Sequence, residues 1–261
     1  MKIGIFYKKE NPEIIGLIKS EASKYNFIFD NDDPDVVFSI GGDGTFLKSV
    51  HKYINSLDKI VFIGINAGTL GFFYDFTKEN IPEIFKTISS NNFKYEERPL
   101  LGASVKYKKS VEEIYAINEI RIENPFHTLT ADVFVDNELL EPYCGNGLIV
   151  SSNLGSSGYN KSLGGALIDH DLAALELTEV ASIQNKAYRS LNSPLVLNPN
   201  KIIEFRNVQS DSIVGYDHLS IHKSDELLEV KIGYSNKKVK ILYSKEHNYV
   251  QRIRKSFVLW F

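Results

Sequence analysis

The run Gly41-Gly42-Asp43-Gly44-Thr45 constrains this chain more than any other feature, because it separates two apolar segments of different periodicity. Before it, residues 36–40 form a short apolar run rich in β-branched side chains, which is typical of a buried strand. After it, apolar residues from Phe46 to Ile54 recur at helical spacing. The glycines are therefore predicted to form a turn from a strand into a helix.

Such a turn suits a phosphate group. Glycines let backbone N–H groups approach a ligand closely, and the amino terminus of the following helix favours anions. Asp43 needs a separate reason, since its carboxylate would repel phosphate. It could accept a proton from a substrate hydroxyl or hold a metal beside the phosphates. The alternative is that Asp43 only caps a helix that begins near Thr45. The pattern is neither a P-loop nor the dinucleotide fingerprint.

The composition excludes several classes of protein. The chain has 261 residues, enough for one large domain or two medium ones, with 43% hydrophobic and 24% charged residues. Its net charge of −3 argues against non-specific binding to nucleic acid. No apolar run approaches the roughly 18 residues of a membrane span. The apolar stretch within residues 1–10 is too short for a signal peptide. Cys144 is the only cysteine, which fits a cytoplasmic protein.

The first part of the chain alternates strands and helices. Strands are predicted at 2–7, 27–29, 36–40 and 60–65, and helices at 12–25, after the glycine turn, and at 81–88. This alternation predicts a parallel sheet with helices on both faces. Ligands of such sheets bind beyond the carboxyl ends of the strands, where the loops 41–45 and 66–71 would both open.

Near residue 98 the pattern changes to a period of two. Strands are predicted at 101–107, 113–122, 131–135, 147–151, 201–205, 227–232 and 238–242, with a hairpin turn at Asp136-Asn137. Many short strands with few helices predict a β-sandwich. We therefore expect an α/β domain over residues 1–97 and a β-rich domain over residues 98–244.

The last stretch, residues 245–261, is basic and then apolar. An apolar tail has to be buried, so we expect it to pack back on the first domain or on a second subunit. The alternative is a tail that touches a membrane, although one short segment supplies little apolar area for this.

Two stretches of the second domain carry polar chemistry. Asn118-Glu119 can grip a sugar diol, since the amide donates or accepts and the carboxylate accepts two hydroxyl protons. The alternative is an ordinary half-exposed polar pair on a sheet. The segment 145–165 combines glycines with hydroxyl side chains and Tyr159, which predicts a nucleotide-binding loop rather than a flexible surface loop. Asp169-His170-Asp171 and Asp217-His218 have metal-ligand side chains, but sequence neighbours seldom all reach one ion, so we assign no metal ligand.

Three motifs in this order resemble those of bacterial NAD kinases. They are Gly41–Thr45, then Asn118-Glu119, then the run from Gly155 to Gly165, GSSGYNKSLGG. Residues 177–183, 188–189, 193–197 and 217–221 also look like that family. The resemblance implies a Rossmann-like N-terminal domain with a parallel sheet, a C-terminal β-sandwich domain, a cleft between them and a homodimer or homotetramer.

The resemblance also implies an activity. A family member transfers the γ-phosphate of ATP, or a phosphoryl group of polyphosphate, to the 2′-hydroxyl of the adenosine ribose of NAD, which yields NADP. Magnesium is expected as a cofactor, because phosphoryl transfer depends mainly on positioning and charge neutralisation. Two alternatives remain from the residues alone: a dinucleotide-binding protein without turnover, and a lipid kinase that shares the pentapeptide.

Residue roles follow from the same resemblance. Asp43 would orient or deprotonate the 2′-hydroxyl, and the amides of Gly42, Gly44 and Thr45 would hold phosphates. The remaining candidates would bind the dinucleotide: Phe72, Asn118, Glu119, Asn146, Ser157, Gly158, Tyr159, Ser162, Ala181, Ile183, Tyr188 and Asp217. Of these, Ala181, Ile183 and Tyr188 would lie on the nicotinamide side.

The chain departs from the family pattern at Cys144-Gly145-Asn146-Gly147, where an arginine–glycine–aspartate–glycine run is usual. Gly158 also replaces a common alanine. Loss of the arginine and aspartate would weaken affinity for NAD, because charge-assisted hydrogen bonds are about twice as strong as neutral ones.

Overall fold

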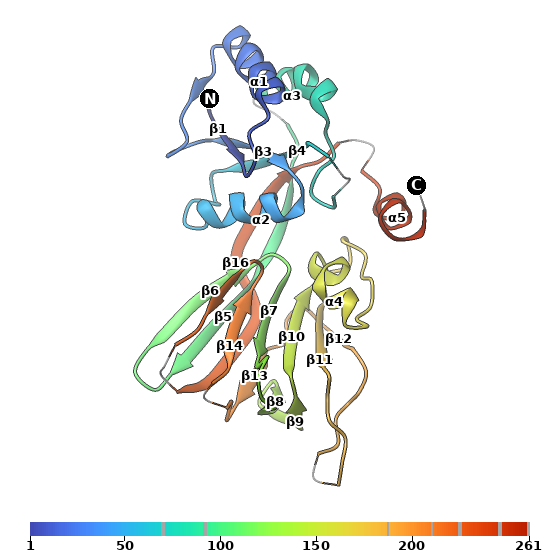
Figure 1. The fold of residues 1–261 in the computed structure, drawn as a ribbon. Coiled ribbons are helices and arrows are strands. Elements are labelled where there is room, and N and C mark those ends of the chain that lie inside the picture. Colours follow the sequence, from blue (N-terminus) through green and yellow to red (C-terminus); the bar gives the residue numbers. More distant parts are fainter. Residues whose placement is uncertain are drawn as a thin grey trace. The chain divides into compact units, whose positions relative to one another are not determined.

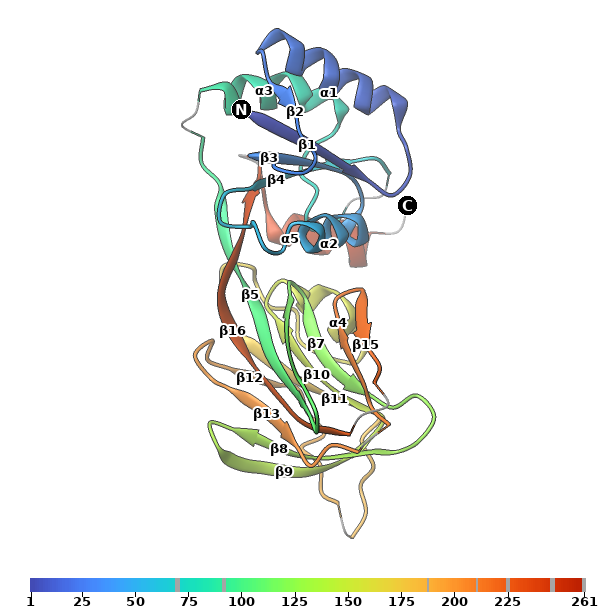
Figure 2. The ribbon, with the colours of Figure 1, turned by 90° about the vertical axis from the view of Figure 1, so that its left-hand side faces the viewer.

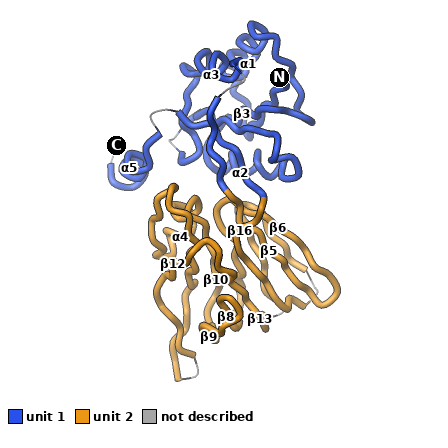
Figure 3. Tube along the Cα trace, turned by 180° about the vertical axis from the view of Figure 1, so that it is seen from behind, with its two compact units in different colours: residues 1–98, 237–261 blue, residues 99–236 orange. Residues whose placement is uncertain are grey.

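The structure is a computed structural model that describes residues 1–68, 71–90, 93–186, 188–209, 211–223, 226–244 and 247–259. The chain divides into two compact units (Figure 3). Unit 1 comprises Met1–Arg98 and Lys237–Phe261, and unit 2 comprises Pro99–Asn236. The domain limits expected from the sequence, residues 1–97 and 98–244, remain a prediction. Of the expected apolar tail, residues 245–246 and 260–261 lie outside the described residues.

Unit 1 contains a parallel sheet. Its strands are β1 (Lys2–Tyr7), β2 (Ile28–Phe29), β3 (Val36–Gly41) and β4 (Val61–Asn66), in the order β2-β1-β3-β4. The end of β16 (Leu227–Leu242) adds to β4 in parallel, with Lys240 paired to Val61. Since β3 and β4 are paired from Val36↔Val61 to Gly41↔Asn66, both strands end at the same edge. The parallel sheet expected from the alternating pattern is confirmed.

Helices cover both faces of this sheet (Figures 1 and 2). α1 (Pro12–Lys24) and α3 (Ile81–Ser89) pack on one face, and α2 (Asp43–Lys52) lies on the other. The first face is built from isoleucines of α1 and α3 against branched residues of the strands. The second face is aromatic. The Phe46 ring of α2 stacks on the Phe73 ring with their centroids 4.7 Å apart, and it packs edge to face with Phe62.

Unit 2 consists of two sheets that share one apolar core. The first has the order β6-β5-β16-β13-β8-β9, and the second has the order β12-β11-β10-β7-β14-β15. The bounds are β5 Glu96–Tyr107, β6 Val111–Ala116, β7 Glu119–Glu123, β8 Leu129–Val135, β9 Glu138–Gly145, β10 Gly147–Ser152, β11 Leu175–Val180, β12 Leu195–Leu197, β13 Ile203–Arg206, β14 Ile213–Tyr216 and β15 Leu219–Ile221. Buried residues of both sheets form a single cluster, so the expected sandwich is confirmed.

Local signals of the sequence explain the ends of several elements. Asn11 caps α1 by accepting a hydrogen bond from the Ile14 amide at 3.2 Å, and Pro12 follows at the first helical position. Asp136 and Asn137 have φ values of 50° and 69°, as the predicted hairpin turn between β8 and β9 requires.

The chain ends in α5 (Tyr249–Ile253) and one π-helical stretch, Arg254–Val258. No helix among the described residues is long and apolar enough to cross a membrane.

Close backbone packing at Gly64 gives a prediction about stability. A Cβ at this position of β4 would lie 2.2 Å from the carbonyl oxygen of Phe73, so Gly64→Ala should lower the free energy of unfolding by about 3 kcal/mol. Gly16→Ala on the exposed side of α1 meets no atom within 4 Å and should raise it by about 0.5–1 kcal/mol. Urea denaturation of both variants tests this, and equal midpoints would contradict the close packing.

Candidate functional site

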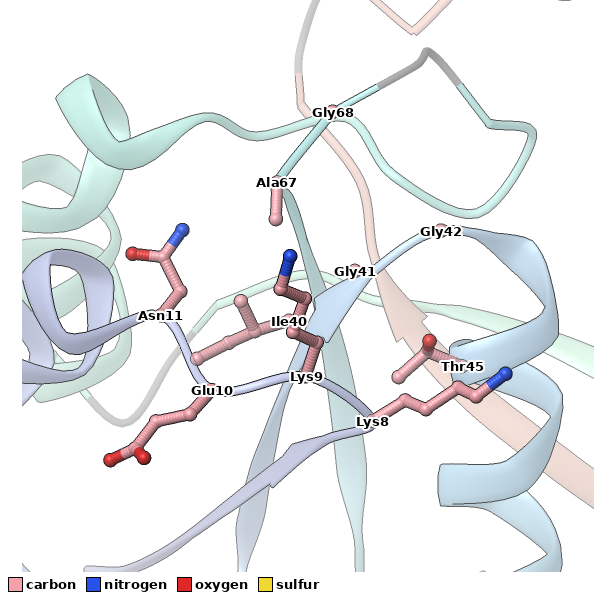
Figure 4. Close-up of a pocket in the computed structure, with 10 residues that line it drawn as sticks. All are labelled: Lys8, Lys9, Glu10, Asn11, Ile40, Gly41, Gly42, Thr45, Ala67 and Gly68. Carbon is pink, nitrogen blue, oxygen red and sulfur yellow. The ribbon is translucent and has the colours of Figure 1, made fainter.

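The glycine turn connects β3 to α2 as the sequence predicted, and Figure 4 shows Gly41, Gly42 and Thr45 at the edge of a pocket in unit 1. Gly42 is the N-cap of α2, and the helix begins at Asp43 rather than near Thr45. Gly41 has a φ of 152°, and a Cβ there would lie 2.7 Å from the Thr45 hydroxyl oxygen. The Thr45 amide donates to the Gly42 carbonyl at 2.6 Å. Only glycine fits position 41, because both its backbone angle and its contact with Thr45 exclude a side chain.

The Asp43 carboxylate does not cap its own helix. It accepts hydrogen bonds from the amides of Phe72 at 2.9 Å and Phe73 at 3.0 Å, which belong to the loop after β4. Burial raises the pKa of Asp43, and the two amides and the positive charge of Arg252 oppose this shift. Gly71 is required beside it, since a Cβ there would lie 2.3 Å from Asp43 Oδ1. The carboxylate therefore joins the glycine turn to the loop that carries Phe72.

Arg252 of α5 fixes the other side of this loop. Its guanidinium donates to the carbonyl oxygens of Gly71 and Tyr74 and forms an ion pair with the buried Asp75. Burial lowers the pKa of Arg252, and Asp43 opposes this shift. The same C-terminal segment covers Phe72, whose ring centroid lies 6.3 Å from that of Tyr249 and 6.0 Å from that of Phe257. A segment near the end of the chain thus orders the loop that holds Asp43.

In unit 2, a second aspartate repeats this arrangement. Asp217 accepts hydrogen bonds from the amides of Ile117 at 2.9 Å and Asn118 at 2.8 Å. These two amides are therefore withdrawn from the sheet, and the strand predicted over residues 113–122 is in fact two strands, β6 and β7, with Asn118 between them. The expectation that Asn118 lies within a strand is wrong, because Asp217 binds the amides of residues 117 and 118.

Asn118 is held rigidly by its backbone. Its carbonyl accepts from the Ser152 amide at 2.8 Å, and a Cβ on Gly155 would lie 2.2 Å from the same oxygen. Its side-chain Oδ1 is buried and has no hydrogen-bond partner among the described residues. An acceptor that is buried without a donor is costly, so Asn118 Oδ1 is suited to bind a hydroxyl or amide of a ligand.

Glu119 begins a charged face of β7 that continues with Arg121 and Glu123. Arg121 donates to Glu119 at 3.2 Å and to Glu123 at 2.8 Å. Glu119 is 5% exposed, and burial, with a smaller contribution from Asp217, raises its pKa to about 8. Tyr159 donates from its hydroxyl to Glu123 at 3.1 Å. Arg121 and Glu123 are not among the sequence candidates, although their spacings of two and four from Glu119 indicated a shared face of the strand.

The segment around Tyr159 is held in place by hydrogen bonds of Asn160. Asn160 donates to the buried Glu176 at 2.7 Å and accepts from the Thr178 hydroxyl at 2.7 Å. Two short helical turns, Gly155–Ser157 and Tyr159–Ser162, follow β10. Ser157 and Gly158 are half-buried, whereas Tyr159 and Ser162 are exposed. Hydrogen bonds of Asn160 therefore attach this segment to β11.

A separate group of candidates lies near the Glu123 end of the sheet. Asn146 follows β9, and its amide donates to the Val180 carbonyl at 2.9 Å. Ala181, with a φ of 48°, comes next, and the Ile183 amide donates to the Cys144 carbonyl at 2.7 Å. The amide of the half-buried Tyr188 donates to Asn185 at 2.9 Å.

These candidates are distant from Asn118 along the sheet. Gly147 is paired with Glu123, whereas Ser151 is paired with Glu119. Four strand residues span roughly 13 Å, so the structure separates the Asn146 group from Asn118.

The segment Asp169-His170-Asp171, which has metal-ligand side chains, contains a buried residue. His170 is 2% exposed, and its carbonyl accepts from Asn153 at 2.6 Å. Asp169 accepts from the Asp171 amide at 2.9 Å. Within the described part of the chain, no three histidine, cysteine, aspartate or glutamate side chains form a group that could hold a metal ion.

Comparisons with known proteins agree on one family. Residues 18–93 match the model of the ATP-NAD kinase N-terminal domain. The chain is 34% identical to an NAD kinase of Lysinibacillus sphaericus over 262 residues, which is 99% of both chains. It is 36% identical to NAD kinase 1 of Listeria innocua over 238 residues, 90% of both chains.

Two solved structures share the fold. Yeast NADH kinase complexed with NADH superposes with a TM-score of 0.85 and 20% identity, covering 100% of this chain and 89% of the other. An NAD kinase from Archaeoglobus fulgidus in complex with ATP gives a TM-score of 0.77 and 21% identity, covering 98% and 99%.

Arg252 should be essential for stability. Arg252→Met leaves the Asp75 charge and two carbonyl oxygens without this donor, which should lower the free energy of unfolding by about 3–5 kcal/mol. The matched control Arg254→Met removes an exposed arginine of the same segment and should change it little. Urea denaturation compares the two, and an unfolding midpoint of Arg252→Met equal to that of wild type would contradict the role of the ion pair.

The raised pKa of Glu119 predicts a pH-dependent stability. The folded protein keeps this proton up to about pH 8, whereas the unfolded chain loses it near the ordinary pKa of 4.5. The Glu119 contribution to the free energy of unfolding therefore falls as pH rises between these values. Glu119→Gln cannot ionise, so its stability relative to wild type should rise by up to about 1.4 kcal/mol per pH unit in this window.

Urea denaturation at pH 5, 6, 7 and 8 measures this difference. The control Glu113→Gln, at an exposed carboxylate of β6, should differ from wild type by a constant amount. A constant difference for Glu119→Gln as well would show that Glu119 ionises normally.

Proposed function

Because the chain belongs to the NAD kinase family, we propose that it transfers a phosphoryl group from ATP or polyphosphate to the 2′-hydroxyl of the adenosine ribose of NAD, giving NADP. It is a phosphotransferase whose acceptor is an alcohol group. The observation that carries this proposal is the 34% identity to a curated NAD kinase over 99% of both chains. A lipid kinase would not be expected to match such enzymes over the whole length.

Asp43 is the proposed catalytic residue. Both of its oxygens accept one amide each, which fixes the carboxylate, while each oxygen keeps a lone pair for a further donor. Burial raises the pKa of this group, which makes the carboxylate a stronger base than an exposed aspartate. These features support a role in orienting the 2′-hydroxyl and accepting its proton as the bond to phosphorus forms.

The amides of Gly42, Gly44 and Thr45 are proposed to bind phosphate oxygens, although the Thr45 amide also donates to the Gly42 carbonyl at 2.6 Å and would share its proton. Gly42 and Gly44 support this role, because a Cβ at either position would meet no atom within 4 Å and the backbone is open there. Phe72 is proposed to contact the adenosine.

In unit 2, Asn118 and Glu119 are proposed to bind NAD at a ribose and near the adenine. The unpaired Asn118 Oδ1 supports the first contact. Burial raises the pKa of Glu119 to about 8, which favours the protonated form, and a protonated carboxyl can donate as well as accept a hydrogen bond. Asp217 would position Asn118 through its backbone amide. Ser157, Gly158, Tyr159 and Ser162 would complete the pocket, with Asn146, Ala181, Ile183 and Tyr188 on the nicotinamide side.

Magnesium is proposed to arrive with the phosphoryl donor. The described residues offer no group of three metal-ligating side chains, and Asp43 already accepts two amides, so the ion would be held mainly by phosphate oxygens and water. When bound, it would offset the negative charge of the phosphates.

We also propose a homodimer or homotetramer in the cytoplasm. Cys144 is buried and free, which fits a reducing compartment.

The reaction is tested with purified protein, NAD, magnesium and either ATP or a polyphosphate series, and NADP is read with an NADP-specific dehydrogenase. NADP formation supports the proposal and identifies the donor. If NAD binds but no NADP forms with either donor, the chain is a dinucleotide-binding protein, and the Cys144 and Asn146 positions become the first to restore as arginine and aspartate.

Asp43→Asn should lower turnover by about 10²–10⁴-fold, because the neutral amide cannot accept the hydroxyl proton. Binding of NAD, measured by calorimetry, should persist. The control Asp58→Asn removes an exposed carboxylate of the same unit and should retain turnover. Wild-type turnover in Asp43→Asn would refute the assignment of the base.

A further inference from the structure

The chain passes from the first sheet of unit 2 to the second between β9 and β10. β9 pairs with β8, whereas β10 pairs with β7 and β11, so Asn146 joins two different sheets. It lies between Gly145 at the end of β9 and Gly147 at the start of β10. The backbone at this crossing therefore depends on contacts other than a ladder between its two flanking strands.

The Tyr143 side chain of β9 bridges the two sheets at this crossing. Its ring is fully buried in the apolar core that both sheets share. Its hydroxyl accepts from the Gly147 amide at 3.1 Å and donates to the Val180 carbonyl of β11 at 2.7 Å. Burial raises the pKa of Tyr143, so the phenol keeps its proton and remains a donor. A Cβ on Gly145 would lie 2.0 Å from this hydroxyl, so glycine is required there.

The Val180 carbonyl is fixed by two donors. It accepts from the Tyr143 hydroxyl and also from the Asn146 amide, which lies at 2.9 Å. The same peptide plane contains the nitrogen of Ala181, so holding the carbonyl oxygen limits the rotation of that plane. Ala181 has a φ of 48°, a left-handed backbone conformation that alanine adopts only where its surroundings impose it. The Tyr143 hydroxyl is thus one of the contacts that impose this conformation.

The far end of the loop after β11 is held by two carboxyl groups. The Leu191 amide donates to Glu141 at 2.7 Å and to Glu179 at 3.1 Å. These hydrogen bonds do not involve the Tyr143 hydroxyl. Loss of that hydroxyl should therefore release the start of the loop, at Ala181, and leave its far end in place.

We propose that the Tyr143 hydroxyl is a positioning group for the dinucleotide, because it holds Ala181, on the proposed nicotinamide side of the NAD site, in its left-handed conformation. The inference rests on the proposed function for the identity of this ligand, and it adds a residue that none of the motifs contains. Because Tyr143 is buried, it acts through the Val180 carbonyl and not by contact with the ligand.

Calorimetric binding of NAD and of ADP-ribose, which lacks the nicotinamide ring, is the first measurement. Tyr143→Phe should raise the dissociation constant for NAD about tenfold, since a buried, hydrogen-bonded hydroxyl is lost. The dissociation constant for ADP-ribose should rise by less than about threefold. The matched control Tyr107→Phe removes the hydroxyl of another buried tyrosine of the same core, on β5, and should bind both ligands as wild type does.

A double-mutant cycle tests the route through Ala181. Glycine adopts a positive φ without strain, so Ala181→Gly removes the need for a firmly held Val180 carbonyl. In an Ala181→Gly background, Tyr143→Phe should therefore raise the dissociation constant for NAD by less than about threefold. An effect of Tyr143→Phe that is as large in this background as in wild type would overturn the proposal.

Steady-state kinetics gives a third measurement. Tyr143→Phe should raise the KM for NAD about tenfold and leave kcat and the KM for the phosphoryl donor within about twofold of wild type. Wild-type affinity for NAD, or equal weakening of NAD and ADP-ribose, would overturn the proposal. Loss of NAD affinity in Tyr143→Phe, in a protein that forms no NADP, would refute only the proposed reaction. If the wild-type protein bound no NAD, the proposed function and this inference would both fail.

Discussion

The structure of unit 1 depends on where the Asp43 carboxylate finds its hydrogen-bond donors. A buried carboxylate is unfavourable unless its oxygens are satisfied, and here two consecutive amides of the loop after β4 satisfy them. The same loop presents its carbonyl oxygens to Arg252. The backbone N–H groups of the loop thus donate to the Asp43 carboxylate, and its carbonyl oxygens accept from the Arg252 guanidinium. Glycine is required at position 71 because of this close approach.

Unit 2 uses the same physical device at Asp217. In each unit one aspartate accepts the amides of two neighbouring residues, and in each unit the residue so held is a proposed ligand contact, Phe72 or Asn118. A carboxylate has two oxygens at a separation that matches consecutive backbone N–H groups, so it fixes a bend that a sheet ladder would otherwise straighten. Phe72 and Asn118 thus lie at backbone bends that are stabilised by a carboxylate and not within the regular strands beside them.

Periodicity was sufficient to predict the parallel sheet, its helices and the sandwich, because these elements bury apolar faces of fixed spacing. It failed where one side chain from far along the chain overrides local preference. Asp217 interrupts the strand expected at 113–122, and no pattern near Asn118 indicates this. β16 was predicted as two strands because Gly233 and polar residues interrupt its apolar pattern. The role of Arg252 depends on contacts with residues about 180 positions earlier, which sequence spacing does not reveal.

Unit 1 is built from both ends of the chain, so its two parts leave the ribosome at different times during synthesis. Residues 1–98 emerge first, yet the strand end that pairs with β4 and the arginine that holds the Asp43 loop emerge last. Unit 2 is continuous in sequence and is complete before them. Domains generally fold as units during synthesis, so the sandwich can reach its final state first. A chain interrupted before residue 237 would carry a complete unit 2 and an unfinished unit 1.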